Sequence, residues 1–154
     1  MSVSKTFTSE ERQAWIESWP RKAIISKVLL RNSRNQLLIV KPDYKDSWVF
    51  PGGGVNKGES PKGAAVRETF EEVGINLNYK DLELAEILFD KKFDSLTLIY
   101  LFKNILDDEV KLNLQKDEID DYQFRDATEL MELLPVHYSK FIDNRLQSII
   151  TNIS

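Results

Sequence analysis

Residues 53–75 constrain the fold of this chain more than any other stretch. They read GGVNKGESPKGAAVRETFEEVGI, a glycine-rich turn that leads into a helix with signals at both ends. Ser60 is a favourable N-cap, and Pro61 is favoured as the first helical residue. Gly74 stands where a left-handed residue usually ends a helix. The sequence therefore predicts a helix over residues 61–73.

The predicted helix has one acidic side and one largely apolar side. At about 100° per residue, the carboxylates of Glu68, Glu71 and Glu72 fall within roughly one third of the circumference. The opposite side carries Val66, Thr69, Phe70 and Val73, with Ala65 at its edge. Carboxylates at i and i+4 repel each other, and a divalent cation would offset that repulsion. Mg²⁺ prefers such oxygen ligands and is usually completed by water and substrate phosphates.

This stretch resembles the signature of the Nudix hydrolase family. The residues that match it are Gly53, Glu59, Arg67, Glu68, Glu71, Glu72, Gly74 and Ile75. Thr69 departs from the pattern, which has an apolar residue at that position. Because Thr69 lies on the side expected to be buried, the departure concerns packing and leaves the carboxylates untouched.

The resemblance implies an enzyme that hydrolyses a diphosphate bond in a nucleotide-type substrate, with Mg²⁺ or Mn²⁺ as cofactor. It implies that Glu71 and Glu72 are metal ligands and that Glu68 is a ligand or the proton acceptor for the attacking water. The backbone carbonyl of Gly52 or Gly53 is a candidate additional ligand. Glu118, on a late loop before an aromatic-containing strand, is a further candidate metal ligand or general base; otherwise it is solvated.

Other residues are candidates for supporting roles. Arg67 lies four residues before Glu71, within reach of a bidentate contact, and we expect it to orient Glu71 or Glu59. The loop over residues 41–47 and the segment that follows it into the glycine turn supply three candidates for substrate contact: Lys41, Tyr44 and Trp48. Packing in the core is the alternative for Trp48.

The length and composition favour a single domain. The chain has 154 residues, of which 42% are hydrophobic and 30% charged, typical of a globular protein. We expect one domain over residues 1–154, with residues 1–20 as an N-terminal helical extension. The longest apolar run, residues 98–102, is too short to span a bilayer, and the N-terminus does not read as a signal peptide. With no cysteine to form disulfides, a cytoplasmic location is the simplest expectation.

The net charge of −4 argues against a protein that binds duplex nucleic acid, because such binding needs a basic face. It does not argue against a small polyanionic substrate, since bound cations invert the sign of an acidic site. We therefore expect a small nucleotide or nucleoside diphosphate derivative as the partner, and neither a nucleic acid duplex nor a membrane.

Hydrophobic patterning predicts the remaining elements. We expect a short helix over residues 10–17, another that begins at Asp126 and ends before Pro135, and a C-terminal amphipathic helix. Strands are expected over residues 23–30, 36–40, 83–90, 96–103, 110–114 and 119–124. This order indicates an α/β fold, a mixed sheet with helices on both faces. The family resemblance implies the same α/β/α sandwich.

Three alternatives stay open at this stage. The substrate can be a (deoxy)nucleoside triphosphate, the default, or another nucleoside diphosphate derivative; a triphosphorylated or capped RNA end has no basic patch in its favour. The domain can also be a catalytically silent sensor that binds a nucleotide without cleaving it. Finally, the chain can form a homodimer, for which Trp15 and Trp19 are candidate interface residues.

Overall fold

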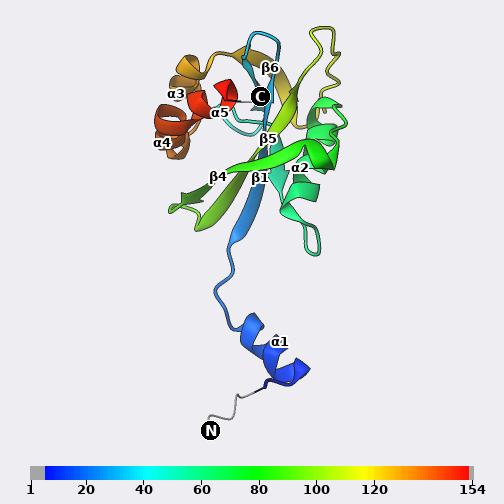
Figure 1. Cartoon of the computed structure of the whole chain (residues 1–154), viewed down its shortest axis with the longest axis vertical. Helices are drawn as coiled ribbons and strands as arrows, with labels where there is room; N and C mark the ends of the chain where they lie inside the picture. Colours follow the sequence, from blue (N-terminus) through cyan, green and yellow to red (C-terminus); the bar gives the residue numbers. More distant parts are fainter. Residues whose placement is uncertain (1–5, 153–154) are drawn as a thin grey trace.

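A mixed sheet forms the middle of the fold in the computed structural model, which describes residues 6–152 (Figure 1). Its strands are β1 (Ala23–Arg31), β2 (Leu37–Pro42), β3 (Gly52–Gly54), β4 (Leu82–Asp90), β5 (Ser95–Ile105) and β6 (Ile119–Arg125). Their order is β4-β5-β1-β2-β6, and β3 pairs with β1. The β1–β5 pair is parallel and the other pairs are antiparallel. The predicted α/β fold with a mixed sheet is confirmed.

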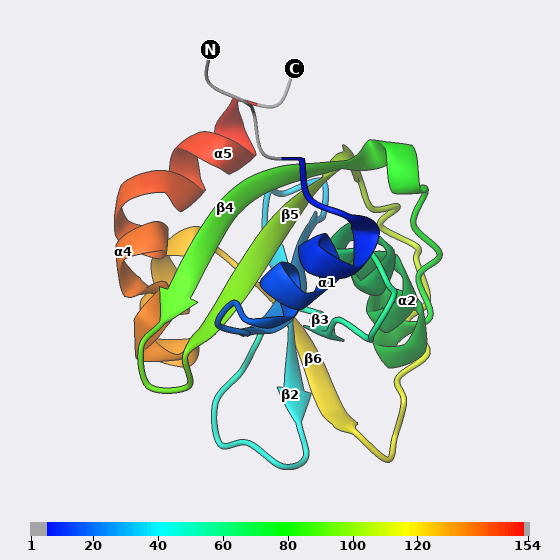
Figure 2. The same ribbon diagram turned by 90° about the horizontal axis from the view of Figure 1, so that it is seen from below.

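Helices cover both faces of this sheet (Figure 2). On one face lies α2 (Pro61–Val73). On the other lie α3 (Leu130–Leu133), α4 (Ser139–Phe141), a π-helical turn over Ile142–Leu146, and α5 (Gln147–Thr151). Val28 and Leu30 of β1 belong to the core under α2, whereas Leu29 belongs to the core under the C-terminal helices. This alternation explains why β1 is apolar at successive positions, since both of its faces are buried.

The ends of α2 fall at the predicted residues. The Ser60 side chain accepts a hydrogen bond of 3.0 Å from the Gly63 N–H, which satisfies one of the free donors at the N-terminus. At the other end, Gly74 has a φ of +74°, and its N–H bonds to the Phe70 carbonyl at 2.9 Å. Short 3₁₀ turns occur at Tyr79–Asp81, Ala127–Glu129 and Val136–Tyr138.

The predicted strand over residues 110–114 is wrong. This segment is irregular, although Val110, Leu112 and Leu114 pack against the core under α2. Its backbone bonds to the end of α2 instead of to a strand: Asn113 N–H to the Val73 carbonyl at 2.9 Å, and Gln115 N–H to the Glu72 carbonyl at 3.0 Å. The last carbonyls of a helix need hydrogen-bond donors. Here the donors come from the segment after residue 110, whose alternating apolar residues had predicted a strand.

The predicted apolar side of α2 is wrong at one position. Phe70 is 56% exposed, whereas Glu72, which we had placed on the acidic side, is only 6% exposed. Thr69 and Val73 are fully buried as expected. The helix is thus rotated so that Glu72, and not Phe70, faces the sheet.

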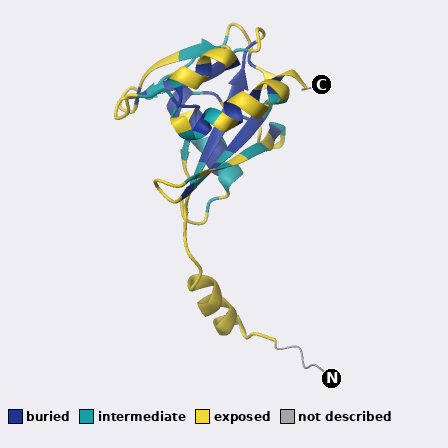
Figure 3. Ribbon diagram, turned by 90° about the vertical axis from the view of Figure 1, so that its left-hand side faces the viewer, coloured by how far each residue is buried: buried dark blue, intermediate teal, exposed yellow. Residues whose placement is uncertain are grey.

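The N-terminal helix α1 (Ser9–Glu17) lies apart from the sheet (Figures 1 and 3). It begins with a capping box, in which Thr8 and Glu11 exchange side-chain to backbone hydrogen bonds of 3.0 and 3.1 Å. None of its residues is buried. The division into a single domain with residues 1–20 as an extension stays a prediction, and residues 1–5 lie outside the described part.

Within residues 6–152, no helix combines the length and the apolar character needed to cross a membrane.

Thr69 gives a testable prediction about the stability of α2. Its hydroxyl is buried and has no hydrogen-bond partner among the described residues. Because an unpaired buried hydroxyl costs about 1–3 kcal/mol, Thr69→Val should raise the free energy of unfolding by roughly 1 kcal/mol in urea titrations. The exposed Thr128→Val control should stay within about 0.5 kcal/mol of the parent. A destabilised Thr69→Val protein would contradict this account.

Candidate active site

The glycine-rich turn brings the backbone of β3 against α2. Gly52 and Gly53 of β3 pair with Lys27 and Ser26 of β1. Gly52 has a φ of +129°, and a Cβ at this position would lie 2.0 Å from the Ser26 carbonyl oxygen. A Cβ on Gly53 would lie 2.6 Å from the carboxyl carbon of Glu68. Glycine is therefore needed at position 52, where a Cβ would meet the backbone of β1, whereas a larger residue at position 53 would push the Glu68 carboxylate away from the turn.

Glu72 is a buried carboxylate at the centre of this arrangement. Its Oε2 accepts a hydrogen bond of 2.8 Å from the Gly52 N–H. The pKa of Glu72 is raised to about 7, mainly by burial and in smaller part by the carboxylates of Glu68 and Glu118, while Lys27 and the Gly52 N–H act in the opposite direction. The pKa increase indicates that this carboxylate has less positive charge around it than its ionised form requires.

Lys27 is a site residue that the sequence analysis missed. It lies in the middle of β1, and its ammonium donates a hydrogen bond of 2.5 Å to the carbonyl oxygen of Gly52. Burial lowers the pKa of Lys27 to about 8, although Glu72 and Glu68 act in the opposite direction. The signal was present in the sequence, because a lysine interrupts the apolar strand sequence AIISKVLL. Lysine is almost never fully buried without a partner.

Arg67 contacts the remaining carboxylates around the glycine turn. Its guanidinium contacts Glu59 through two bonds of 2.7 and 3.0 Å, Glu68 at 2.7 Å and Glu71 at 3.1 Å. It also donates to the Gly54 carbonyl at 3.0 Å. The hydrogen bonds from Arg67 hold the pKa of Glu59 down to about 2. Arg67 therefore lies in contact with both Glu59 and Glu71, the two residues we had expected it to orient.

As the side chains lie, no group of three or more His, Cys, Asp or Glu residues within positions 6–152 is arranged to hold a metal ion. Arg67 engages Glu68 and Glu71, and Glu72 bonds to the Gly52 N–H. The donor chemistry nevertheless fits Mg²⁺, because hard carboxylate oxygens gather around one turn and the raised pKa of Glu72 reflects a shortage of positive charge. A metal would have to draw these side chains away from Arg67.

Two loops bring further predicted residues to this site. Glu118 contributes to the raised pKa of Glu72, so its carboxylate lies within electrostatic reach. Partial burial raises the pKa of Tyr44, and the carboxylates of Glu72, Glu118 and Glu68 raise it further. The loops are also joined directly, since the Asp43 N–H donates to the Glu118 carbonyl at 2.9 Å.

Lys41 and Trp48 are placed differently from Tyr44. The ammonium of Lys41 bonds within its own loop, to the carbonyls of Lys45 and Pro42. Trp48 packs against the core under the C-terminal helices, and its backbone N–H donates to Leu133 at 3.2 Å. Its indole thus takes the core position that we had weighed as the alternative, and substrate contacts by Lys41 and Trp48 stay predictions.

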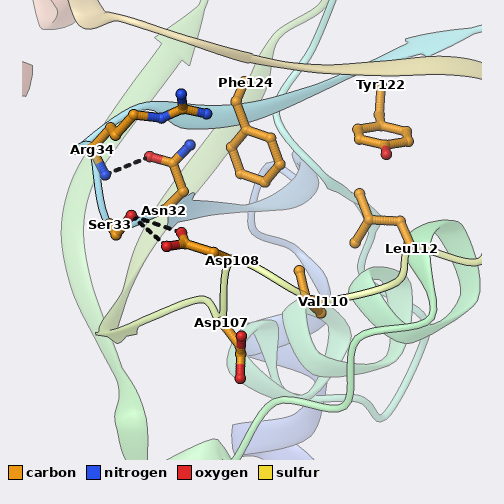
Figure 4. Close-up of a pocket in the computed structure, with 9 residues that line it drawn as sticks. All are labelled: Asn32, Ser33, Arg34, Asp107, Asp108, Val110, Leu112, Tyr122 and Phe124. Carbon is orange, nitrogen blue, oxygen red and sulfur yellow. Dashed lines mark hydrogen bonds between the residues drawn. The ribbon is translucent and has the colours of Figure 1, made fainter.

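A separate cavity of about 460 Å³ lies at the far end of β6 (Figure 4). Its lining residues are Asn32, Ser33, Arg34, Asp107, Asp108, Val110, Leu112, Tyr122 and Phe124. None of the predicted site residues is among them. Along an extended strand, Tyr122 and Phe124 lie about 13 and 20 Å from Glu118, so this cavity is distinct from the acidic site.

Residues 21–144 match the family model of the NUDIX domain. The chain belongs to the Nudix family. The matched region begins just before β1 and includes the glycine turn, α2 and Glu118, whereas α1 lies outside it. The Nudix signature residues are therefore the ones that the fold gathers around Gly52 and Gly53.

Related proteins are similar in sequence to parts of this Nudix chain. An RNA pyrophosphohydrolase from Nitratiruptor sp. is 34% identical over 98 residues, 56% of this chain and 63% of the relative. Another from Blochmanniella floridana is 45% identical over 60 residues, 39% of this chain and 37% of the relative. The matches thus span less than two thirds of either relative. The crystal structure of a MutT protein from Methanosarcina mazei superposes with a TM-score of 0.70 at 20% identity, over 86% of this chain and 99% of that one, which shows the shared fold.

The buried carboxylate predicts a specific pH dependence of stability. The pKa of Glu72 rises from 4.5 to about 7 in the folded chain, so the folded state keeps a proton that the unfolded chain has lost. Stability from this group is therefore greatest below pH 4.5 and falls as the pH rises to 7. We expect Glu72→Gln to remove a loss of roughly 2–3 kcal/mol over this range, measured by urea unfolding in chelator.

The exposed Glu71→Gln variant is the matched control for this measurement and should keep the slope of the parent. The difference between parent and variant is decisive, since other groups also titrate over this range. Parallel pH profiles for the parent and Glu72→Gln would show that Glu72 has an ordinary pKa.

Proposed function

We propose that this chain is a metal-dependent pyrophosphohydrolase that cleaves a diphosphate bond in a nucleotide-type substrate. The observation that carries the proposal is the buried Glu72 carboxylate, held by the Gly52 N–H at 2.8 Å on the same helix as Glu68 and Glu71. A buried carboxylate with a raised pKa is costly, and such groups concentrate at functional sites. A solvated acidic helix face would show no such burial.

Glu68, Glu71 and Glu72 are the residues that would hold Mg²⁺ or Mn²⁺, with the carbonyl of Gly52 or Gly53 as a further donor. When bound, the ion neutralises phosphate charge and lowers the pKa of a coordinated water. The chain's own task is then positioning and electrostatics. Arg67, through its contacts with Glu59, Glu68 and Gly54, holds the acidic side of the helix against the glycine turn.

Two carboxylates compete for the role of general base. Glu68 lies against Gly53, whereas Glu118 lies on the segment between β5 and β6, which is hydrogen-bonded to the end of α2. Either could accept the proton of the attacking water at a carboxylate oxygen. Tyr44, with Lys41 at the end of β2 before it, is the proposed contact for the substrate's phosphates or base, since the neighbouring Asp43 N–H bonds to the Glu118 carbonyl.

The proposed substrate is a (deoxy)nucleoside triphosphate or another nucleoside diphosphate derivative. The names of the related RNA pyrophosphohydrolases support keeping an RNA end among the candidates. The negative net charge favours substrates that arrive with bound cations over long duplexes. A cytoplasmic location and a homodimeric state complete the proposal.

A panel of substrates tests the activity directly. The panel consists of nucleoside triphosphates, nucleotide sugars, dinucleoside polyphosphates and a triphosphorylated RNA, assayed with Mg²⁺ or Mn²⁺ for released phosphate or pyrophosphate. We expect turnover that requires the metal and that falls at least 100-fold in Glu72→Gln. Glu109→Gln, an exposed glutamate outside the site, should retain the parent rate.

Two results would overturn the assignment. Full activity in Glu72→Gln would remove the helix carboxylate from the chemistry. Nucleotide binding in calorimetry with no turnover on any member of the panel would instead identify a sensor, the alternative function.

A second variant decides the role of the late loop. If Glu118 is a metal ligand or the general base, Glu118→Gln should lower kcat at least tenfold while KM changes little, because the loss falls on the transition state. Asp117→Asn, the exposed neighbour, is the control. A rate within about twofold of the parent would leave Glu68 as the candidate base.

A further inference from the structure

α1 is a well-formed helix whose apolar residues remain exposed. Its capping box is complete, and Trp15 and Trp19 pack edge to face with ring centroids 4.7 Å apart. Yet Trp15 is 51%, Ile16 45% and Trp19 50% exposed. An isolated helix of this length is marginal in water, so most of its stability must come from packing against another surface.

A second, partly exposed apolar surface lies on β4, β5 and the start of β1. We call it the β4–β5 patch, and its residues are Ile24, Ile87, Phe89, Leu96 and Leu98. The strand register places them on one face, because Phe89 and Ile24 both pair with Leu96, and Ile87 pairs with Leu98. Ile87 is 49% and Phe89 53% exposed. The face is the one that carries α2, but α2 lies to one side of these strands (Figure 2).

The linker between α1 and β1 begins at the rim of this patch. Lys22 forms an ion pair of 2.5 Å with Asp94 in the β4–β5 turn, and its ammonium lies 5.3 Å from the Phe89 ring centroid. From there the chain leads away from the sheet to α1 (Figure 1). The helix and the patch thus belong to one chain but do not cover each other, which is the condition for exchange between two copies.

Charge complements the apolar match. α1 carries Glu10, Glu11 and Glu17 against a single basic residue, Arg12. The turn at the end of the patch carries the exposed Lys91 and Lys92 between Asp90, whose side chain is largely buried, and Asp94, which is paired with Lys22. An acidic helix placed over the patch would therefore meet basic side chains at its rim, which favours one docking site and orientation over others.

We propose that a second copy of this chain covers the β4–β5 patch with its α1, in a reciprocal exchange about a two-fold axis. The half-exposed aromatic and aliphatic side chains of one α1 offer roughly 400 Å². Counted on both surfaces and for both helices, the exchange buries about 1,600 Å², the size of a standard stable interface. The proposal adds a specific interface to the expected homodimer and is independent of the proposed activity.

Light scattering after size-exclusion chromatography tests the oligomeric state. At about 10 μM the full chain should have the mass of a dimer, and both Trp15→Ser/Trp19→Ser and Phe89→Glu should halve that mass. Tyr79→Ser, which alters an exposed aromatic residue outside both surfaces, should leave the dimer intact. Circular dichroism on each variant checks that the domain remains folded.

Disulfide trapping then identifies which chain provides the helix. Because the natural sequence has no cysteine, only the introduced thiols can pair. A mixture of Ile16→Cys chains and Phe89→Cys chains should give a covalent heterodimer under mild oxidation, in higher yield than either variant alone.

Three outcomes would overturn the proposal. The first is a monomeric parent, even if an Ile16→Cys/Phe89→Cys double variant forms a disulfide within a single chain. A dimer that survives both sets of substitutions would place its interface elsewhere. A dimer without the mixed cross-link would do the same.

Discussion

The hydrogen bond from the Gly52 N–H to the buried Glu72 carboxylate is the interaction on which the site depends. It requires glycine in the turn, an α2 rotated so that position 72 faces the sheet, and a strand pair that brings Gly52 alongside Lys27. Each of these features serves the others. A carboxylate is costly to bury, and here one backbone donor and one ammonium offset part of that cost.

Two cationic side chains lie on different sides of the acidic site. Lys27 approaches from the buried side through the Gly52 carbonyl, whereas Arg67 joins Glu59, Glu68 and Glu71 on the more exposed side. Hydrogen bonds from Arg67 lower the pKa of Glu59, whereas burial raises that of Glu72, although both are glutamates of one signature. The Nudix signature thus combines a carboxylate already satisfied by arginine with one that still lacks positive charge.

Local signals predicted the parts of the fold that local interactions determine. The caps of α2, the strands with apolar residues on both faces and the contacts of Arg67 all follow from spacing along the chain. The orientation of α2 did not follow from spacing, because a helical wheel gives the angles between residues but not which residue faces the sheet. Phe70 was therefore predicted on the buried side and Glu72 on the exposed side, the reverse of their positions in the structure. Lys27 joins the site only through the long-range pairing of β1 with β3, and residues 110–114 pack like a strand without forming one.

The loop that carries Glu118 is held by three backbone hydrogen bonds, two to the end of α2 from Asn113 and Gln115 and one to the neighbouring loop from Asp43. Tyr44 follows Asp43 directly in the sequence, so the proposed substrate contact adjoins the backbone hydrogen bond to Glu118. Backbone hydrogen bonds therefore connect the two loops and the end of α2. A ligand bound by the loop of Tyr44 would lie one backbone hydrogen bond away from the loop of Glu118, and this connection needs no contact between the side chains of the two loops.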